Sequence, residues 1–537
     1  MMTLKDEDID LAAHPEIYDT TLGQFDTDEV LLSFEERRAY SGDVYSTGAI
    51  AAAVLRPKDR STCAAMVAMA RSRGYAVIPR GGGLSYTGGY RPLDEKSVIL
   101  DTSRLNRVLE VNALDMYITV EAGVTWKQIH DVLTPLGLRL PFFGTFSGAQ
   151  ATVGGGLSNG ALFFGTARYG TAADHVLGLA VVLADGRELR TGQRAFTNAA
   201  KPFYRTCGPD FTGLLTHDAG SFGVKVEATF RLIQAPACTG HVSFVFEGMA
   251  AAGTALSAIA RTGAAEEAYV FDPESTRKNL QSQGVAKDFS VLLNVVKGER
   301  SLLKGLVAGA RLALAGRSFL PPDAFSLHIT CAARNDAALQ ADLEACRSVC
   351  LGLAGKPIAD SIPRSVRANL FPAPDAVLGP EGDRWAALNA KVAHSDAIRI
   401  MAASEAVIAP YRERMRRSGV WMSHLLIAIG QSAFSFEPVF HWKDEWLPLH
   451  SRTLSEAART RLVEPTANPA ARALVDEIRQ KLVACFAQLG AASNQLGKTY
   501  PYLDVLRPES AELALAVKRA LDPQGVMNPG ALGIKAT

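Results

Sequence analysis

The sequence predicts an α+β protein that is built from two regions. Three observations carry this prediction. Patterns of short strands and amphipathic helices alternate over residues 59–137. A run dominated by Gly, Ala, Ser and Thr follows over residues 152–172. After Pro236 the composition changes, and strand patterns such as 242–246 are mixed with alanine-rich helical patterns such as 252–261.

The first predicted helix covers residues 59–74, and Gly74 ends it. Its apolar side chains recur at helical spacing, at Cys63, Met66, Val67 and Ala70. Thr125 is predicted to cap a second helix that carries Ile129 and Leu133.

The later elements follow the same reasoning. The 152–172 run favours neither helix nor strand, so its backbone groups need external partners such as a bound cofactor. Alanine-rich helices are also expected over residues 303–315 and 467–487.

A glycine-rich loop is the most informative motif. An apolar strand over residues 76–78 leads through Arg80 into Gly81, Gly82 and Gly83. Because glycine has no Cβ, its backbone N–H can approach an anion closely, and Arg80 adds a positive charge beside it. The loop is therefore typical of a pyrophosphate site.

Two common phosphate folds do not fit this loop. A Rossmann turn needs a helix that opens on the last glycine, whereas Tyr90-Arg91-Pro92 does not begin one. A Walker loop needs a glycine five residues before Gly-Lys-Thr, and that position before Gly497-Lys498-Thr499 is Ala492.

Composition excludes several other classes. The 56 basic and 55 acidic residues nearly cancel and form no basic tract, so nucleic acid is not an expected partner. No apolar run is long enough to span a bilayer, and the first residues lack the apolar region of a secretory signal. Seven scattered cysteines indicate reduced thiols in the cytoplasm, with Cys346 and Cys350 as packing residues of one helix.

Several motifs occur in an order that resembles the flavin domain of the vanillyl-alcohol oxidase superfamily, the PCMH-type FAD domain. They lie at 56–59, 79–85, 119–124, 152–156, 168–170, 181–186, 220–224 and 522–530. The resemblance implies an α+β fold in which two small subdomains hold FAD and an α+β cap covers it. We expect a lead-in over 1–45, the FAD domain over 46–235, the cap over 236–490 and a return to the FAD domain over 491–537.

The resemblance also implies a set of cofactor-binding residues. They are Arg80, Gly81, Gly82, Gly83, Leu84, Ser85, Thr152, Gly155, Gly156, Ser158, Arg168, Tyr169, Gly170, Gly220, Gly223, Val224 and Asn528. In several relatives a histidine of the glycine loop bonds covalently to the flavin, and here Leu84 stands at that position. We therefore expect non-covalent FAD, while a bond from His424 or His441 of the cap stays open.

The expected substrate site lies under the cap. Phenol-oxidising relatives hold a phenolate with a tyrosine and an arginine, and the matching positions here are Tyr500 and Pro501. Their flavin-side aspartate falls on Ser158. The 2-hydroxy-acid branch carries a metal-binding histidine motif, whose place at 428–435 lacks both histidines, so no metal is expected. The residues predicted to contact substrate are Tyr86, Lys498, Tyr502 and His424.

The predicted catalytic residues are His441, Glu437 and Tyr500. His441 and Glu437 are four apart in an alternating strand, so their side chains share one face. We expect His441 to be the base and Glu437 to orient it; a purely structural pair would give the same pattern.

The resulting prediction is an FAD-dependent oxidoreductase that takes a hydride from a hydroxyl-bearing carbon, with a 2-hydroxy acid as the leading small-molecule substrate. Para-substituted phenols or aryl alcohols are the alternative substrates. A non-catalytic electron-transfer flavoprotein and a flavin-free binding scaffold are the alternative roles. The electron acceptor (O₂, a quinone or a cytochrome) and a homodimeric state stay open.

Overall fold

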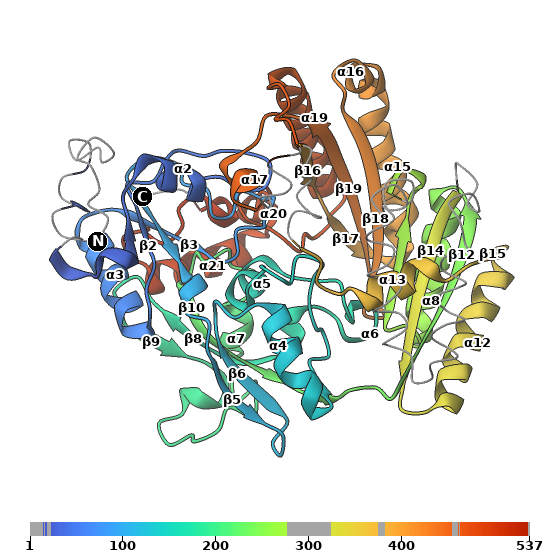
Figure 1. Cartoon of the computed structure of the whole chain (residues 1–537), viewed down its shortest axis with the longest axis horizontal. Coiled ribbons are helices and arrows are strands. Elements are labelled where there is room, and N and C mark those ends of the chain that lie inside the picture. The colour runs from blue at the N-terminus through green and yellow to red at the C-terminus, as the bar shows by residue number, and fades with distance from the viewer. Residues whose placement is uncertain are drawn as a thin grey trace.

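The structure is a computed structural model that describes residues 14, 17–18, 23–275, 324–373, 382–453, 460 and 462–534. Two small sheets and their helices form one side of the molecule, and one large sheet with its helices forms the other (Figure 1). Helices and strands are therefore mixed, which confirms the predicted α+β class.

The first small sheet carries the glycine loop. Its strand order is β1 (Val30–Leu31), β2 (Ala53–Leu55), β4 (Ser97–Asp101), β3 (Ala76–Arg80). Strands β2, β4 and β3 are parallel, and β1 is antiparallel to β2. Helix α3 (Arg60–Ser72) begins after Asp59, whose side chain accepts a hydrogen bond from the N–H of Thr62, and its four predicted apolar residues are buried. Helix α2 (Phe34–Tyr40) precedes strand β2 in the chain.

The second small sheet is antiparallel. Its order is β5 (Val108–Asn112), β6 (Tyr117–Glu121), β10 (Val224–Arg231), β8 (Val176–Val182), β9 (Glu188–Arg190). Helix α4 (Trp126–Leu133) has the predicted Thr125 cap, and in return the Gln128 side chain accepts a hydrogen bond from the N–H of Thr125. A short pair, β7 (Leu138–Arg139) and β11 (Ile233–Gln234), and the four-residue helix α7 (Phe211–Leu214) complete this part.

One expectation for this region was wrong. Within the 152–172 run, residues Val153–Asn159 form helix α5 and Thr166–Tyr169 form helix α6. The Thr152 side chain caps α5 by accepting from the N–H of Gly155, and the first helical N–H groups donate to the carbonyls of Val124 and Ala122. Tertiary hydrogen bonds thus override the weak helix propensity of glycine.

The large sheet has eight strands, all antiparallel. Their order is β15 (Lys356–Ile358), β12 (Cys238–Glu247), β14 (Ala324–Ala333), β13 (Glu267–Phe271), β18 (Trp421–Ile429), β19 (Ala433–Lys443), β16 (Asp383–Ala387), with β17 (Ala390–Ala393) also on β19. One face packs on α8 (Met249–Thr262), α12 (Asp336–Gly352), α15 (Ala397–Ile408) and α19 (Pro469–Gln488), which include two of the predicted alanine-rich helices. The predicted helix at 303–315 lies outside the described residues.

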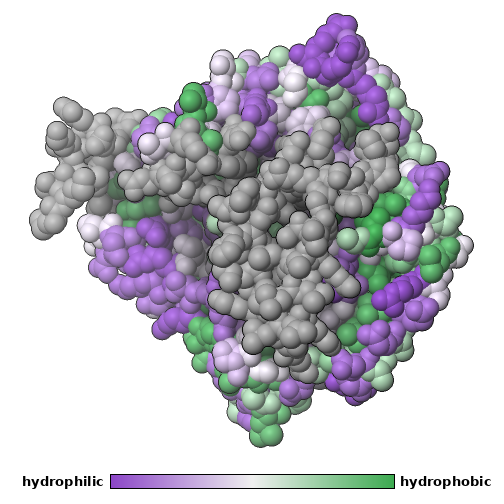
Figure 2. Space-filling model, turned by 45° about the vertical axis from the view of Figure 1, so that its right-hand side comes forward, coloured by the Kyte–Doolittle hydropathy of each residue, from purple (hydrophilic) through white to green (hydrophobic). Residues whose placement is uncertain are grey.

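Shorter helices flank this sheet. They are α13 (Ser361–Ala368), α16 (Arg412–Arg417) and α17 (Pro448–Thr453). The top of the molecule, at the height of α16, is hydrophilic (Figure 2). On α12, Cys346 and Cys350 are buried as predicted, and the Sγ of Cys346 lies 3.8 Å from that of Cys331.

The C-terminal segment returns to the glycine-loop sheet with α20 (Tyr502–Val505) and α21 (Pro508–Leu521). The N–H of Val77 in β3 donates to the carbonyl of Val526, and the N–H of Asn528 donates to the carbonyl of Val77. No helix in the described ranges is long and apolar enough to cross a membrane.

Candidate functional site

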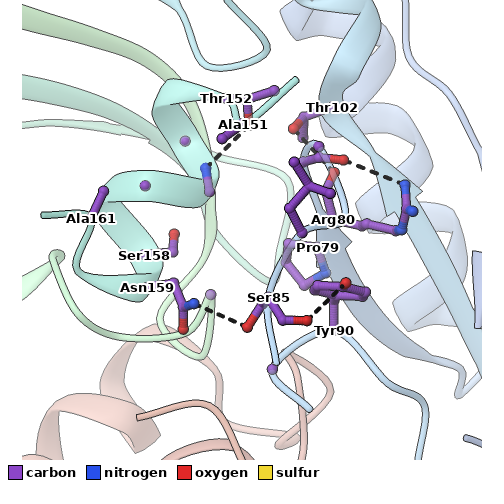
Figure 3. Close-up of a pocket in the computed structure, with 18 of the residues that line it drawn as sticks. Pro79, Arg80, Ser85, Tyr90, Thr102, Ala151, Thr152, Ser158, Asn159 and Ala161 are labelled. Atoms are coloured by element: carbon purple, nitrogen blue, oxygen red, sulfur yellow. Dashed lines mark hydrogen bonds between the residues drawn. The ribbon is translucent and has the colours of Figure 1, made fainter. Parts of the chain in front are cut away.

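A cleft of about 980 Å³ lies between the glycine loop and helix α5. Residues of the β3 loop and residues of α5 face one another across it (Figure 3). The walls also include five residues around the start of β10 and one of the return segment: Ala219, Gly220, Gly223, Val224, Lys225 and Gln495.

The glycine loop presents its backbone to the cleft. Within the described part of the chain, the N–H groups of residues 82–85 have no hydrogen-bond acceptor. A Cβ added at Gly82 would lie 2.2 Å from the carbonyl oxygen of Gln150, and Gly83 has a φ of +72°. The glycines therefore let two loops pack closely and leave a row of amide donors that could bind an anion.

Arg80 supplies a charge that the protein itself does not neutralise. Its side chain is only 8% exposed and lies between the rings of Tyr40 and Tyr90, at 4.6 and 5.4 Å. Among the described residues, no carboxylate lies within ion-pair distance, and its Nε atom has no partner. A buried, unpaired guanidinium is costly unless an anion meets it. Together with the free amides, it fits a diphosphate.

Polar side chains close the other end of the cleft. The Asn159 amide donates to Ser85 Oγ at 3.0 Å and to Gln495 Oε1 at 3.4 Å. Lys225 also lines the cleft, and its Nζ donates to Asp218 at 2.6 Å. This network joins the glycine loop, α5 and the return segment.

Thirteen of the residues predicted to bind the cofactor line the cleft. They are Arg80, Gly81, Gly82, Gly83, Leu84, Ser85, Thr152, Gly155, Gly156, Ser158, Gly220, Gly223 and Val224.

Four predicted residues do not line the cleft, and their role toward FAD stays a prediction. Arg168 points to the large sheet, where it donates to the carbonyls of Ala264 and Ala332. Tyr169 packs edge-on against His175, and Gly170 lies against the Asp174 carboxylate. Asn528 ties the return segment to the carbonyls of Gly89 and Ala219.

Sequence reasoning missed several lining residues. They include Thr102, Trp126, Thr145, Asn159, Lys225 and Gln495. Asn159 belongs to the glycine-rich run and Lys225 follows the 220–224 motif, so both had a usable signal. Gln495 and Trp126 reach the cleft through tertiary packing alone.

The structure gives the predicted pair His441 and Glu437 different contacts. Both side chains lie on one face of β19, as the spacing requires, and no hydrogen bond between them is found among the described residues. His441 stacks on Trp421 at 3.8 Å between ring centres, and its Nε2 lies 2.8 Å from Ser423 Oγ.

Glu437 interacts with two buried tyrosines, Tyr86 and Tyr500. Burial raises the pKa of Glu437 to about 8, and a hydrogen bond from Tyr86 lowers it in part. Burial raises the pKa of Tyr500 to about 12, and its hydroxyl accepts the N–H of Asn389 at 2.7 Å. Burial also raises the pKa of Tyr86 well above its ordinary value, while a hydrogen bond with the cleft residue Gln495 lowers it in part.

The remaining predicted substrate residues lie away from the cleft. His424 is on the opposite sheet face from His441 and pairs with Asp272 at 3.1 Å. The Lys498 ammonium donates to the carbonyl of Arg91, and burial lowers the pKa of Lys498 to about 7. Tyr502 packs on the apolar core of the second small sheet. None of the three lines the cleft, so their contact with substrate stays a prediction.

Comparisons with known proteins point to the same cofactor. Residues 51–192 match the model of the FAD binding domain family. The chain is 33% identical to D-lactate dehydrogenase of Archaeoglobus fulgidus over 180 residues, which are 33% of this chain and 38% of that protein. It is 29% identical to the mitochondrial D-lactate dehydrogenase [cytochrome] of Kluyveromyces lactis over 199 residues, 37% of this chain and 31% of that protein. The matches thus span about a third of each relative.

A solved structure extends the likeness to the whole fold. The structure of p-cresol methylhydroxylase with substrate bound superposes with a TM-score of 0.73 at 17% identity, covering 98% of both chains. The cap and the return segment therefore share the PCMH-type architecture as well. Residues 51–192 thus match the FAD binding domain family, and the chain as a whole shares the fold of the solved structure.

Proposed function

We propose that this protein is an FAD-dependent oxidoreductase that oxidises the hydroxyl-bearing carbon of a 2-hydroxy acid. The unpaired charge of Arg80 beside the free amides of the glycine loop is the observation that carries the proposal, because it is a site built for the cofactor diphosphate. The names of the sequence relatives support the substrate class. When bound, FAD supplies the hydride acceptor.

The chain's own residues hold the cofactor and keep it non-covalent at the glycine loop. Arg80 and the N–H groups of residues 82–85 hold the diphosphate. Leu84 lines the cleft and has no nucleophilic atom. Acid precipitation should therefore leave the flavin in the supernatant. A flavin-labelled peptide that contains His424 or His441 would contradict non-covalent binding.

Proton transfer is assigned to the buried residues next to the cleft. Tyr86 follows the cleft residue Ser85, interacts with Gln495 and hydrogen-bonds to Glu437. Above about pH 8, where Glu437 is ionised, Tyr86 can take the substrate hydroxyl proton and pass its own proton to the Glu437 carboxylate. His441, with Ser423 as its partner, is the second candidate for the base.

The test is anaerobic reduction of the bound flavin by a panel of 2-hydroxy acids and para-substituted phenols. A 2-hydroxy acid should bleach the flavin absorbance. Glu437→Gln or Tyr86→Phe should slow that step by about 10²–10⁴-fold, the usual contribution of a positioned proton acceptor. If only His441→Ala slows it, His441 is the base. Bleaching by phenols alone would replace the hydroxy-acid proposal.

Phenols are kept as the second substrate class for one reason. Tyr86 and Tyr500 lie close enough for the charge of one to raise the pKa of the other. Two neighbouring tyrosines suit a phenolate oxygen, but Pro501 stands where the supporting arginine is expected.

The compartment is also a proposal. Six cysteines are free thiols within the described residues, and three of these are buried on or beside α12. Free thiols are typical of a reducing compartment, and we assign the protein to the cytoplasm on that ground.

A further inference from the structure

A second group of polar side chains lies directly behind the cleft. Gly160 follows the cleft residue Asn159, and Asn494 precedes the cleft residue Gln495. A Cβ added at Gly160 would lie 2.1 Å from the backbone oxygen of Asn494 and 2.7 Å from Nε2 of His217. The three residues therefore meet at one point, and they share a wall with the cleft.

The position of His217 is fixed by the same wall. Its N–H donates to the carbonyl of Leu157 at 2.9 Å, and the N–H of Ala219 donates to the carbonyl of Ser158 at 2.9 Å. His217 has a φ of +55°, a backbone conformation that is uncommon for a residue other than glycine. Such conformations persist where the surroundings require the side chain at that place.

The cap adds two more side chains to this group. Lys391 of β17 and Ser435 of β19 are directly paired across the strands, so their side chains share one face of the sheet. The backbone of Lys391 exchanges two hydrogen bonds with Ala492, at 2.7 and 3.0 Å, which brings it to the segment that holds Asn494. The positive charge of Lys391 also helps to lower the pKa of His217, after burial.

The group has unused hydrogen-bonding capacity. Asn494 is fully buried, and within the described residues neither its Nδ2 nor its Oδ1 has a partner. The same holds for Ser435 Oγ, in a residue that is 1% exposed, and for Nε2 of His217. No described carboxylate lies within ion-pair distance of Lys391; burial lowers its pKa, and the more distant charge of Asp174 raises it in part. Buried polar atoms are nearly always satisfied, so these atoms point to an absent polar partner.

The chemistry of the atoms selects that partner. An ammonium, an amide N–H₂ and a hydroxyl are donors, and one of them is a cation. A carboxylate accepts from all of them at once. We propose that Lys391, Ser435, Asn494 and His217 form the subsite that binds the carboxylate group of the substrate. This inference rests on the proposed function, because it assigns the acid end of a 2-hydroxy acid.

Propionate is the probe, because it carries the carboxylate and has no hydroxyl to oxidise. Its binding to the FAD-loaded protein is measured by perturbation of the flavin absorbance. Lys391→Met and Ser435→Ala should each weaken propionate binding, the former by about 10- to 100-fold, as expected for loss of a charged hydrogen bond. FAD affinity should not change. Lys127→Met is the matched control, because Lys127 is exposed and pairs with Asp131 on α4.

The outcomes separate the subsite from the function. Unchanged propionate binding in both variants, or no propionate binding by the wild type, overturns the subsite. If a 2-hydroxy acid reduces the flavin with the same KM and kcat in both variants, the function stands and the subsite is wrong. If propionate binding depends on Lys391 but no 2-hydroxy acid reduces the flavin, the subsite stands and the proposed function is wrong.

Discussion

At the scale of single residues, Glu437 is an acid that burial keeps protonated near neutral pH. Its pKa is raised to about 8, from an ordinary value of 4.5. The folded state therefore binds a proton that the unfolded state has released, so Glu437 lowers stability progressively as pH rises from about 4.5 to about 8. Since each pKa unit corresponds to about 1.4 kcal/mol, the effect is several kcal/mol.

Glu437→Gln should remove this dependence. The variant should gain stability relative to wild type between about pH 5 and pH 8.5, measured by urea unfolding at both values. The control is Glu413→Gln on α16, an exposed carboxylate paired with Arg416 and Arg417. An equal pH dependence in wild type and Glu437→Gln would show that the acid is not held neutral.

Arg80 gives a second prediction at this scale. Arg80→Met keeps the apolar stem between Tyr40 and Tyr90 but removes the charge. FAD affinity should fall by about 10- to 100-fold, because a charge-assisted hydrogen bond contributes about 1.5–3 kcal/mol. The measurement is FAD titration of the apoprotein, with Arg104→Met as control, since Arg104 binds Asp28 outside the cleft. Equal FAD affinity in Arg80→Met and wild type would remove Arg80 from the diphosphate site.

At the scale of elements, the glycine loop and the segment before α5 depend on each other. The Gly82 carbonyl accepts from Gln150 Nε2 at 2.6 Å, and an added Cβ at Gly82 would meet the Gln150 backbone. Gly82→Ala should therefore lower the melting temperature of the apoprotein, since overpacking costs about 1–3 kcal/mol.

Gly89→Ala is the matched control for this change. Gly89 also lines the cleft, but its added Cβ would lie 3.6 Å from the nearest atom, an ordinary contact. If the Gly82→Ala apoprotein has the melting temperature of wild type but binds FAD more weakly, the glycine is needed for FAD binding and not for packing of the loop.

The same scale explains what the sequence could predict. Helices α3 and α4 were predictable because their caps, Asp59 and Thr125, and their apolar stripes are local signals. Helix α5 was not, because its first N–H groups bond to Val124 and Ala122, which are distant in sequence. Arg168 belongs to the family motif at 168–170, yet its guanidinium donates to the carbonyls of Ala264 and Ala332.

The site divides in the same way. Thirteen of the residues that line the cleft were predictable. Each lies in the glycine loop or in another motif whose order along the chain matches the family. The His441–Glu437 pair was not, because strand spacing gives the face of a side chain but not its partner across the interface. Ser423 and Tyr86 occupy those partner positions, and both come from other segments.

At the scale of the whole molecule, a buried ionic network joins the FAD-binding part to the large sheet. Arg139 of β7 and Arg367 of α13 both bind Glu266, which lies directly before β13 and is fully buried. Both guanidiniums also lie over the ring of Phe143, each at 4.7 Å. Burial alone would raise the pKa of Glu266, but the two arginines outweigh it and lower the pKa to about 2.

Glu266→Gln should therefore loosen the joint between the two parts. Removing one partner of a buried pair leaves unpaired charges and typically costs about 3–5 kcal/mol. Because the folded pKa of Glu266 lies below 4.5, its contribution is complete above about pH 4.5 and is lost as pH falls toward about 2. The stability difference between wild type and variant should shrink over that range, measured by urea unfolding.

The neighbouring Glu267 is the control for this last prediction. It is equally buried and also binds Arg367, but burial dominates and raises its pKa. Glu267→Gln should cost less than Glu266→Gln, because its charge is incompletely compensated and its Oε2 has no partner within the described residues. If the two variants lose the same stability at neutral pH, the joint depends on the shape of these side chains. If only Glu266→Gln is strongly destabilised, its charge holds the FAD-binding part against the cap.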